Sequence, residues 1–140
     1  TGSNNTGAGV NALFSNTTGS FNTATGVNAL LSNTTGSYDT ASGLSALYSN
    51  TTGSNNTATG VQALVFNTTG SNNAGFGVNA LLSNTTGNFN VALGVNSLVH
   101  NITGSNTSRL RARTSIAENS VPTAANPIVP VNSTALSHNK

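Results

Sequence analysis

A seventeen-residue period runs through most of the chain and constrains its fold more than any other feature. Six units begin with Thr-Gly at residues 1, 18, 35, 52, 69 and 86, and a seventh starts at residue 103 and breaks off. No insertion or deletion disturbs this register over 102 residues. Units of constant length occupy equal volumes and stack on one another, as in a solenoid. The period therefore predicts a stack of similar coils.

Invariant small and aliphatic positions within the unit predict a thin, continuous core. The ninth residue is Gly in all six units, the thirteenth is Leu, and the tenth is Val or Leu. The glycine column is interpreted as a corner where the backbone needs a positive φ or a close approach, and the recurrent Thr-Thr-Gly marks the other corner. The predicted core columns are Val10, Leu13, Val27, Leu30, Leu44, Leu47, Val61, Leu64, Val78, Leu81, Val95 and Leu98.

Two short segments lie between the corners of each coil. The first, residues 22–25 in the second unit, is expected to be a short strand. Its sixth and eighth positions become Val91 and Leu93 in the sixth unit, where both are expected to point inward. The second segment, residues 27–31, fits helical spacing and strand alternation equally.

These patterns predict an all-β repeat solenoid, of the β-roll or β-helix kind with 17-residue coils, followed by an extended C-terminal tail. One short helical turn per coil stays open as the alternative for the second segment. The solenoid is assigned to residues 1–108 and the tail to residues 109–140.

Amides and hydroxyls take the place of charges in this chain, which contains 24 Asn and 22 Thr while charged residues make up only 4%. The asparagines at the sixteenth position are expected to form amide ladders along the stack. Each of them also begins an Asn-x-Thr sequon, so this column holds candidate glycosylation sites, with plain turns as the alternative. The six candidates are Asn16, Asn33, Asn50, Asn67, Asn84 and Asn101.

The distribution of charge excludes several classes of function. Asp39 is the one formal charge in the first hundred residues, so no basic face for nucleic acid is expected. The chain has no Cys and no apolar run long enough for membrane insertion. Its two carboxylates, Asp39 and Glu118, lie far apart in sequence, and His100 is interpreted as a surface substitution. No catalytic residue, cofactor or metal site is therefore predicted.

The strings Asn-Thr-Ala-Thr-Gly-Val-Asn-Ala-Leu and Ser-Asn-Thr-Thr-Gly-Ser resemble the repeats of long fibrous surface proteins, notably phage tail-fibre-like proteins. Residues 90–94, Asn-Val-Ala-Leu-Gly, are similar to the strand motif in β-roll head repeats of trimeric autotransporter adhesins, whose period is usually shorter. The resemblance covers residues 1 to about 107. It implies a homo-oligomer, with three chains as in those adhesins, at an extracellular, virion or cell surface.

Exposed aromatic and basic residues are the candidate contacts between subunits. Aromatic residues recur at the fourth position, where an interchain seam is predicted and a glycan-binding strip is the alternative. Alternating arginines open the tail, where a solvated edge that ends the solenoid and a subunit contact both remain open. Prolines then enforce an extended course around one apolar cluster. The candidate contacts are Phe21, Tyr38, Phe89, Arg109, Arg111, Arg113, Ile128, Val129 and Val131.

The sequence thus predicts a non-enzymatic extracellular fibre or filament subunit that assembles end to end. Thr1 begins directly in the repeat, so the first coil is expected to be covered by another copy, or by the tail of another copy, in a head-to-tail filament, unless the chain is an excerpt of a longer fibre. An adhesin or receptor-binding fibre segment that contacts surface glycans is the alternative. Thr-Ala-Thr triplets also resemble the arrays of ice-binding solenoids, but they change to Ala-Gly-Phe and Val-Ala-Leu, so no long array is predicted.

Overall fold

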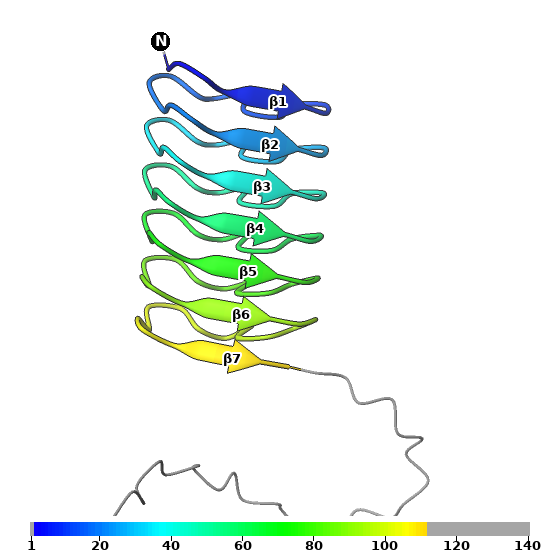
Figure 1. Cartoon of the computed structure of the whole chain (residues 1–140), viewed down its shortest axis with the longest axis vertical. Helices are drawn as coiled ribbons and strands as arrows, with labels where there is room; N and C mark the ends of the chain where they lie inside the picture. The colour runs from blue at the N-terminus through cyan, green and yellow to red at the C-terminus, as the bar shows by residue number, and fades with distance from the viewer. Residues whose placement is uncertain (1, 112–140) are drawn as a thin grey trace, which may run out of the picture.

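The structure is a computed structural model that describes residues 2–111 and forms a regular β-solenoid with one short strand per coil (Figure 1). The strands pair in parallel, in chain order, into one seven-stranded sheet. At the usual strand spacing, β1 and β7 lie about 29 Å apart along the stack. The predicted fold class is confirmed. The strands are β1 Thr6–Ala8, β2 Thr23–Thr25, β3 Thr40–Ser42, β4 Thr57–Thr59, β5 Ala74–Phe76, β6 Val91–Leu93 and β7 Ser108–Leu110.

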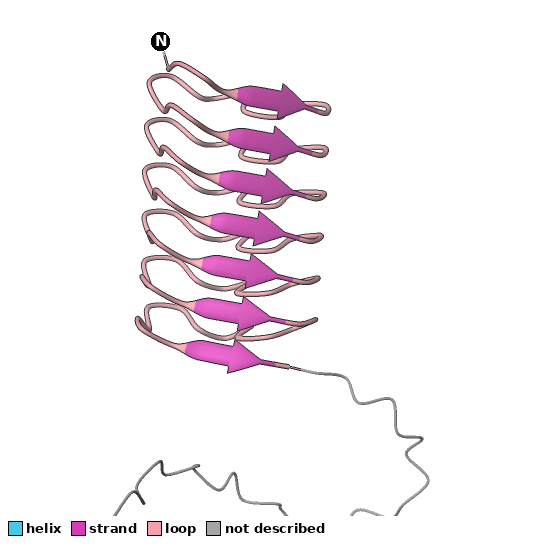
Figure 2. Cartoon of the chain, viewed as in Figure 1, coloured by secondary structure: helices cyan, strands magenta, loops and turns pink. Residues whose placement is uncertain are grey.

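Turns and loops make up the rest of each coil (Figure 2), and residues 2–111 contain no helix. The glycine at the ninth position turns the chain after each strand. Gly60, for example, has a φ of 130°, and a Cβ built on it would lie 2.5 Å from the carbonyl oxygen of Gly77 in the next coil. The predicted corner is confirmed on both counts, because the backbone has a positive φ and approaches its neighbour closely.

The second segment is a run of turns in which residues of positive φ alternate with ordinary ones. In the third coil Ser45 and Leu47 have φ values of 54° and 51°. The amide of Ala46 donates to the Gly43 carbonyl, and the amide of Leu47 donates to Ala63 in the next coil. A left-handed conformation costs a leucine about 1–2 kcal/mol. Burial of the leucine and this hydrogen bond to the next coil, which Leu13, Leu30, Leu64 and Leu81 also make, offset that cost.

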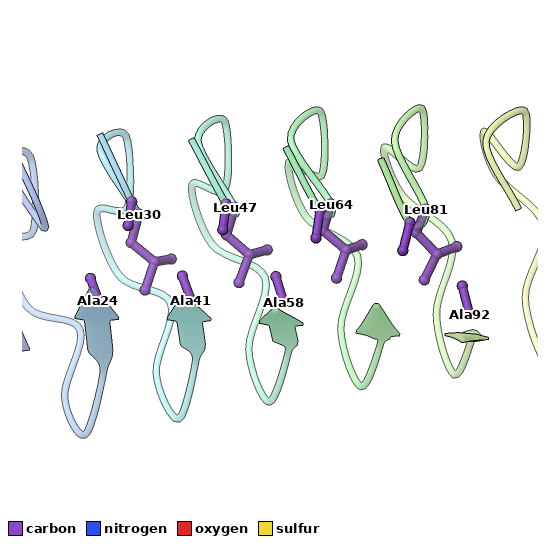
Figure 3. Close-up of a cluster of buried hydrophobic side chains, with 12 residues drawn as sticks. Ala24, Leu30, Ala41, Leu47, Ala58, Leu64, Leu81 and Ala92 are labelled. Carbon is purple, nitrogen blue, oxygen red and sulfur yellow. The ribbon is translucent and has the colours of Figure 1, made fainter. Parts of the chain in front are cut away.

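The core consists of two alanine columns and the leucine column (Figure 3). Leu30, Leu47, Leu64 and Leu81 are fully buried, and Leu13 and Leu98 pack partly buried against them. The leucine part of the predicted core is therefore confirmed. Alanines of the strand and alanines that directly precede the leucines complete it, which keeps the core thin.

The tenth-position column was predicted to lie in the core, and this prediction is wrong. These side chains are exposed, from 39% for Val61 to 66% for Val10. The positive φ at the residues that follow brings two consecutive side chains, such as Ala63 and Leu64, into the core. Neither helical nor strand spacing predicts two consecutive buried side chains. The residues predicted to be in the core and found exposed are Val10, Val27, Leu44, Val61, Val78 and Val95.

Strand side chains also point the other way from the prediction. In β6 the side chains of Val91 and Leu93 are 46% and 48% exposed, whereas Ala92 between them is buried. The same exposed, buried, exposed order holds in β2 and β3. The middle residue must be small because the leucine column fills the space opposite the strand. The sixth and eighth positions therefore form the outer face of the sheet.

The seventh strand moves the predicted end of the solenoid. β7 contains Arg109 and Leu110, which pair in register with Ala92 and Leu93 of β6. The solenoid therefore continues past the boundary expected at residue 108, at least through β7.

The difference between the leucine and tenth-position columns can be measured within one coil. The Leu64→Ala variant is expected to lower the free energy of unfolding by about 2–5 kcal/mol, because it leaves a cavity in the core. The matched Val61→Ala variant removes a half-exposed side chain and should lower it by about 1 kcal/mol or less. Urea unfolding followed by circular dichroism measures both values. Equal losses would contradict the burial described above.

Candidate functional site

The sixteenth-position asparagines form the amide ladder that the sequence predicts. Each Nδ2 donates to the Oδ1 of the same residue in the preceding coil, at 2.9 Å from Asn67 to Asn50 and 2.8 Å from Asn84 to Asn67. The second hydrogen of the Asn67 amide goes to the carbonyl of Gly70, three residues further along the chain, at 2.9 Å. Side chains thus bond coil to coil without any charge.

This ladder removes four of these asparagines from the candidate glycosylation sites. Asn33, Asn50, Asn67 and Asn84 are fully buried. A glycan on Nδ2 would replace a hydrogen that the ladder uses, and the surrounding atoms leave it no path to solvent. Asn16 and Asn101 are partly buried, and their Nδ2 atoms also donate to glycine carbonyls. Burial therefore contradicts glycan attachment at the four fully buried asparagines in the folded coil, and for Asn16 and Asn101 it stays a prediction.

A second buried polar column at the fifth position was missed in the sequence. The Oδ1 of each of these residues accepts a hydrogen bond from the backbone amide of the equivalent residue in the next coil. The Asn22 amide donates to Asn5 Oδ1 at 2.9 Å, and the Asn90 amide donates to Asn73 Oδ1 at 3.0 Å. Its Nδ2 atoms donate to the second-position glycine of the next coil, for example Asn56 to Gly70 at 3.0 Å. The recurrence of an amide at this position was the available signal. The column is Asn5, Asn22, Asp39, Asn56, Asn73 and Asn90.

Asp39 is the exception in this column, because a carboxyl stands where every other coil has an amide. It is fully buried, and its two oxygens accept from the Asn56 backbone amide at 2.8 Å and the Asn50 Nδ2 at 3.2 Å. Burial raises the pKa of this carboxyl from 3.8 to about 7, and these hydrogen bonds oppose the rise. A carboxylate has no hydrogen to donate to the Gly53 carbonyl. That carbonyl therefore accepts one side-chain hydrogen bond, from the Asn50 Nδ2 at 2.9 Å.

Aromatic side chains of the fourth position lie on the surface. Phe21 and Tyr38, from adjacent coils, stack with ring centroids 5.0 Å apart and planes 6° from parallel. Both have a φ of 60°, and the exposed Phe89 has a φ of 56°. Asparagine, which tolerates this conformation best among residues with a side chain, fills the position in the other coils. The stack therefore joins two neighbouring coils while both side chains stay exposed.

The two ends of the described solenoid differ. Inside the stack, the ninth and eleventh amides donate to the preceding coil, as from Gly26 to Ala8 and from Asn28 to Val10, both at 2.8 Å. In the first coil the amides of Gly9 and Asn11 have no such partner within residues 2–111. Among residues 2–111, therefore, no strand pairs with the outer edge of β1.

At the other end, β7 places Arg109 at the inward position that alanine fills in β6. An inward arginine on an edge strand opposes further pairing. This favours the interpretation of Arg109 and Arg111 as an edge that ends the solenoid. The remaining predicted tail contacts, Arg113 with Ile128, Val129 and Val131, lie outside the described residues.

A hollow of about 530 Å³ adjoins β7. Its lining includes Leu98, His100, Arg109 and Arg111, and it contains no carboxylate. It lies beside the last described residue, next to the point where residues 112–140 begin.

Exposed side chains and hydrogen-bond ladders between coils are the recurring features of the described residues. Within residues 2–111 no three His, Cys, Asp or Glu side chains gather to hold a metal ion. The same range includes no helix with the length and hydropathy needed to cross a membrane. Every buried side-chain nitrogen and oxygen there has a hydrogen-bond partner.

No protein family, curated protein or solved structure matches this chain. The function is therefore inferred from the geometry of the chain itself.

Proposed function

We propose that this chain is a structural element of an extracellular fibre, in which the solenoid is a rigid rod and coils stack end to end. The observation that carries this proposal is the repetition of the contacts between coils with a shift of seventeen residues. The Asn50 to Asn33 bond and the Asn67 to Asn50 bond are one such pair. A stack of this kind is a rigid rod, and a coil at its edge leaves backbone groups with which another strand can pair.

In this proposal the outer edge of β1 pairs with another coil, and a second copy of the chain supplies that coil. Free backbone amides at Gly9 and Asn11 and the outer surface of the first coil would be covered there. At the β7 edge Arg109 takes the inward position, which opposes pairing with a further coil, so two copies are expected to join through their β1 edges. The surface between the two ends has amides and hydroxyls and almost no charge, and the proposed work of the molecule is extension and display, without catalysis.

Electron microscopy and analytical ultracentrifugation of the full chain test this proposal. The expected result is concentration-dependent association into rods at least twice as long as one solenoid. The Gly7→Arg variant puts an arginine at the inward position of β1, as Arg109 does in β7, and should abolish association. The matched Ala8→Arg variant adds the same charge to the outer face and should still associate. Single-chain particles at all concentrations, or equal behaviour of the two variants, would overturn the proposal.

A fibre segment that binds surface glycans is the second candidate, and the exposed stack of Phe21 and Tyr38 is the observation that favours it. Sugar rings pack on exposed aromatic side chains, and Phe21 and Tyr38 are 49% and 59% exposed. Binding to a glycan array that disappears when Phe21, Tyr38 and Phe89 become alanine would support this candidate. A wild-type chain that binds no glycan would exclude it.

A further inference from the structure

The outer face of strands β1 to β4 carries two columns of hydroxyl groups in register. The sixth position is Thr in all four strands, and the eighth is Thr or Ser in the last three. Parallel pairing sets Thr23 opposite Thr40 and Thr25 opposite Ser42. We call this surface the hydroxyl face; its residues are Thr6, Thr23, Thr25, Thr40, Ser42, Thr57 and Thr59.

These hydroxyls are free to bond outward. None of them takes part in a hydrogen bond within residues 2–111. The threonines of the seventeenth position behave differently, since Thr34 and Thr51 donate their hydroxyls to the next coil at 2.9 and 3.0 Å. The same residue type therefore serves the stack in one column and faces solvent in the other.

The spacing of the hydroxyl face is set by the sheet. Neighbouring strands lie about 4.8 Å apart and residues two apart on one strand about 6.7 Å, which gives a nearly rectangular grid. The middle residues of β2, β3 and β4 are Ala24, Ala41 and Ala58, whose buried side chains form the same inner surface behind each strand. Rows of oxygen atoms on the prism faces of ice repeat on a comparable rectangular grid.

We propose that the hydroxyl face binds ice. Threonine presents a hydroxyl that joins a water lattice and a methyl group that orders the water beside it, and the sheet holds both at fixed spacing. Charged groups would disturb such a lattice through their own hydration, and the hydroxyl face contains none.

The face has a sharp limit along the stack. In β5 the outer residues become Ala74 and Phe76, and in β6 they become Val91 and Leu93. Ice binding is therefore assigned to the first four coils. This site is independent of the proposed fibre function, because it uses the outer sheet face and leaves both ends of the solenoid free.

Partition of the full chain into a slowly grown ice crystal, together with microscopy of crystal shape, tests the inference. The wild-type chain is expected to enter the ice and to facet the crystal. The Thr40→Tyr variant, with a bulky ring at the centre of the hydroxyl face, should lose both effects. The Thr35→Tyr variant changes an exposed threonine outside the strands and should keep them. Circular dichroism and thermal unfolding of both variants verify that the fold is intact.

Two outcomes would overturn the inference. One is exclusion of the wild-type chain from ice, and the other is equal loss of ice binding in both folded variants. Microcrystalline cellulose serves as a second surface with a regular hydroxyl array. Binding to cellulose without binding to ice would assign the face to a polysaccharide and would likewise overturn the inference.

Discussion

Replacing Asp39 with asparagine is expected to raise the free energy of unfolding by about 4 kcal/mol at about pH 8, and to change it little at about pH 3. Burial raises the pKa of this carboxyl from 3.8 to about 7. A carboxyl whose pKa is raised by folding favours the folded chain while it is protonated. The wild-type chain should therefore lose stability between about pH 4 and pH 7 and stay at the lower value above.

The structure explains why asparagine suits this position better than a carboxylate. In the neighbouring coil the Nδ2 of Asn22 donates to the Gly36 carbonyl at 2.8 Å. The side-chain amide introduced by Asp39→Asn would give the Gly53 carbonyl the same second bond. Protonation of Asp39 supplies a hydrogen at this place in the wild-type chain, which is the second reason why acid stabilises it. No other charged group among the described residues contacts Asp39.

Urea unfolding at a series of pH values, followed by circular dichroism, measures this effect. The reverse variant Asn73→Asp puts a carboxyl into the same column two coils away and is the matched control. It should lose stability with rising pH over the same range, in addition to the loss caused by Asp39. A pH dependence that Asp39→Asn leaves unchanged would show that another group titrates on unfolding.

The Gly60→Ala substitution is expected to be among the most damaging in the chain, with a loss of about 4 kcal/mol or more. The new Cβ would lie 2.5 Å from the Gly77 carbonyl oxygen and 2.6 Å from its carbon. These are backbone atoms that the hydrogen bonds between coils hold in place. The φ of 130° at Gly60 adds strain for any side chain. Neighbouring coils must therefore separate locally to accept the methyl group.

The Gly75→Ala substitution is the matched control with the opposite expectation. Gly75 lies in the inward column of the sheet, where Ala58 and Ala92 occupy the adjacent strands. A Cβ there would have its nearest contact at 3.3 Å, with the Ala80 carbonyl oxygen. Stability should stay the same or rise by up to about 1 kcal/mol, since alanine restricts the unfolded chain. Thermal unfolding compares both variants, and a Gly60→Ala chain as stable as Gly75→Ala would refute the close packing.

Much of the fold follows from the repeat because a fixed period leaves few structures open. The constant Gly, the constant Leu and the sixteenth-position Asn each occupy one environment in every coil, so their corner, core and ladder roles could be predicted. The tenth position could not, because its exposure depends on a positive φ at Leu64 and its equivalents. Leucine rarely adopts that conformation, and no pattern of hydrophobic residues reports it.

The direction of the strand side chains was predicted wrongly for a similar reason. Val91 and Leu93 are more hydrophobic than Ala92, and hydrophobicity alone assigns them to the interior. The decisive quantity is the space left by the leucine column, which admits only a small residue. The fifth-position column was overlooked because asparagine is common throughout the chain, so one more recurring amide gave little contrast. Its role became visible once the hydrogen bonds to the next coil were known.

Disulfide formation between two introduced cysteines tests most directly whether the coils stack in the seventeen-residue register, and the chain has no cysteine of its own. Thr40 and Thr57 are paired neighbours on β3 and β4. Their Cα atoms are about 4.8 Å apart at the usual strand spacing, within the range that a disulfide spans. In the Thr40→Cys, Thr57→Cys chain, mass spectrometry after mild oxidation should find a complete intramolecular disulfide. The Thr40→Cys, Ala74→Cys chain, with its cysteines two strands apart, should stay reduced. Equal oxidation of the two chains, or faster oxidation of the second, would contradict the stacked solenoid.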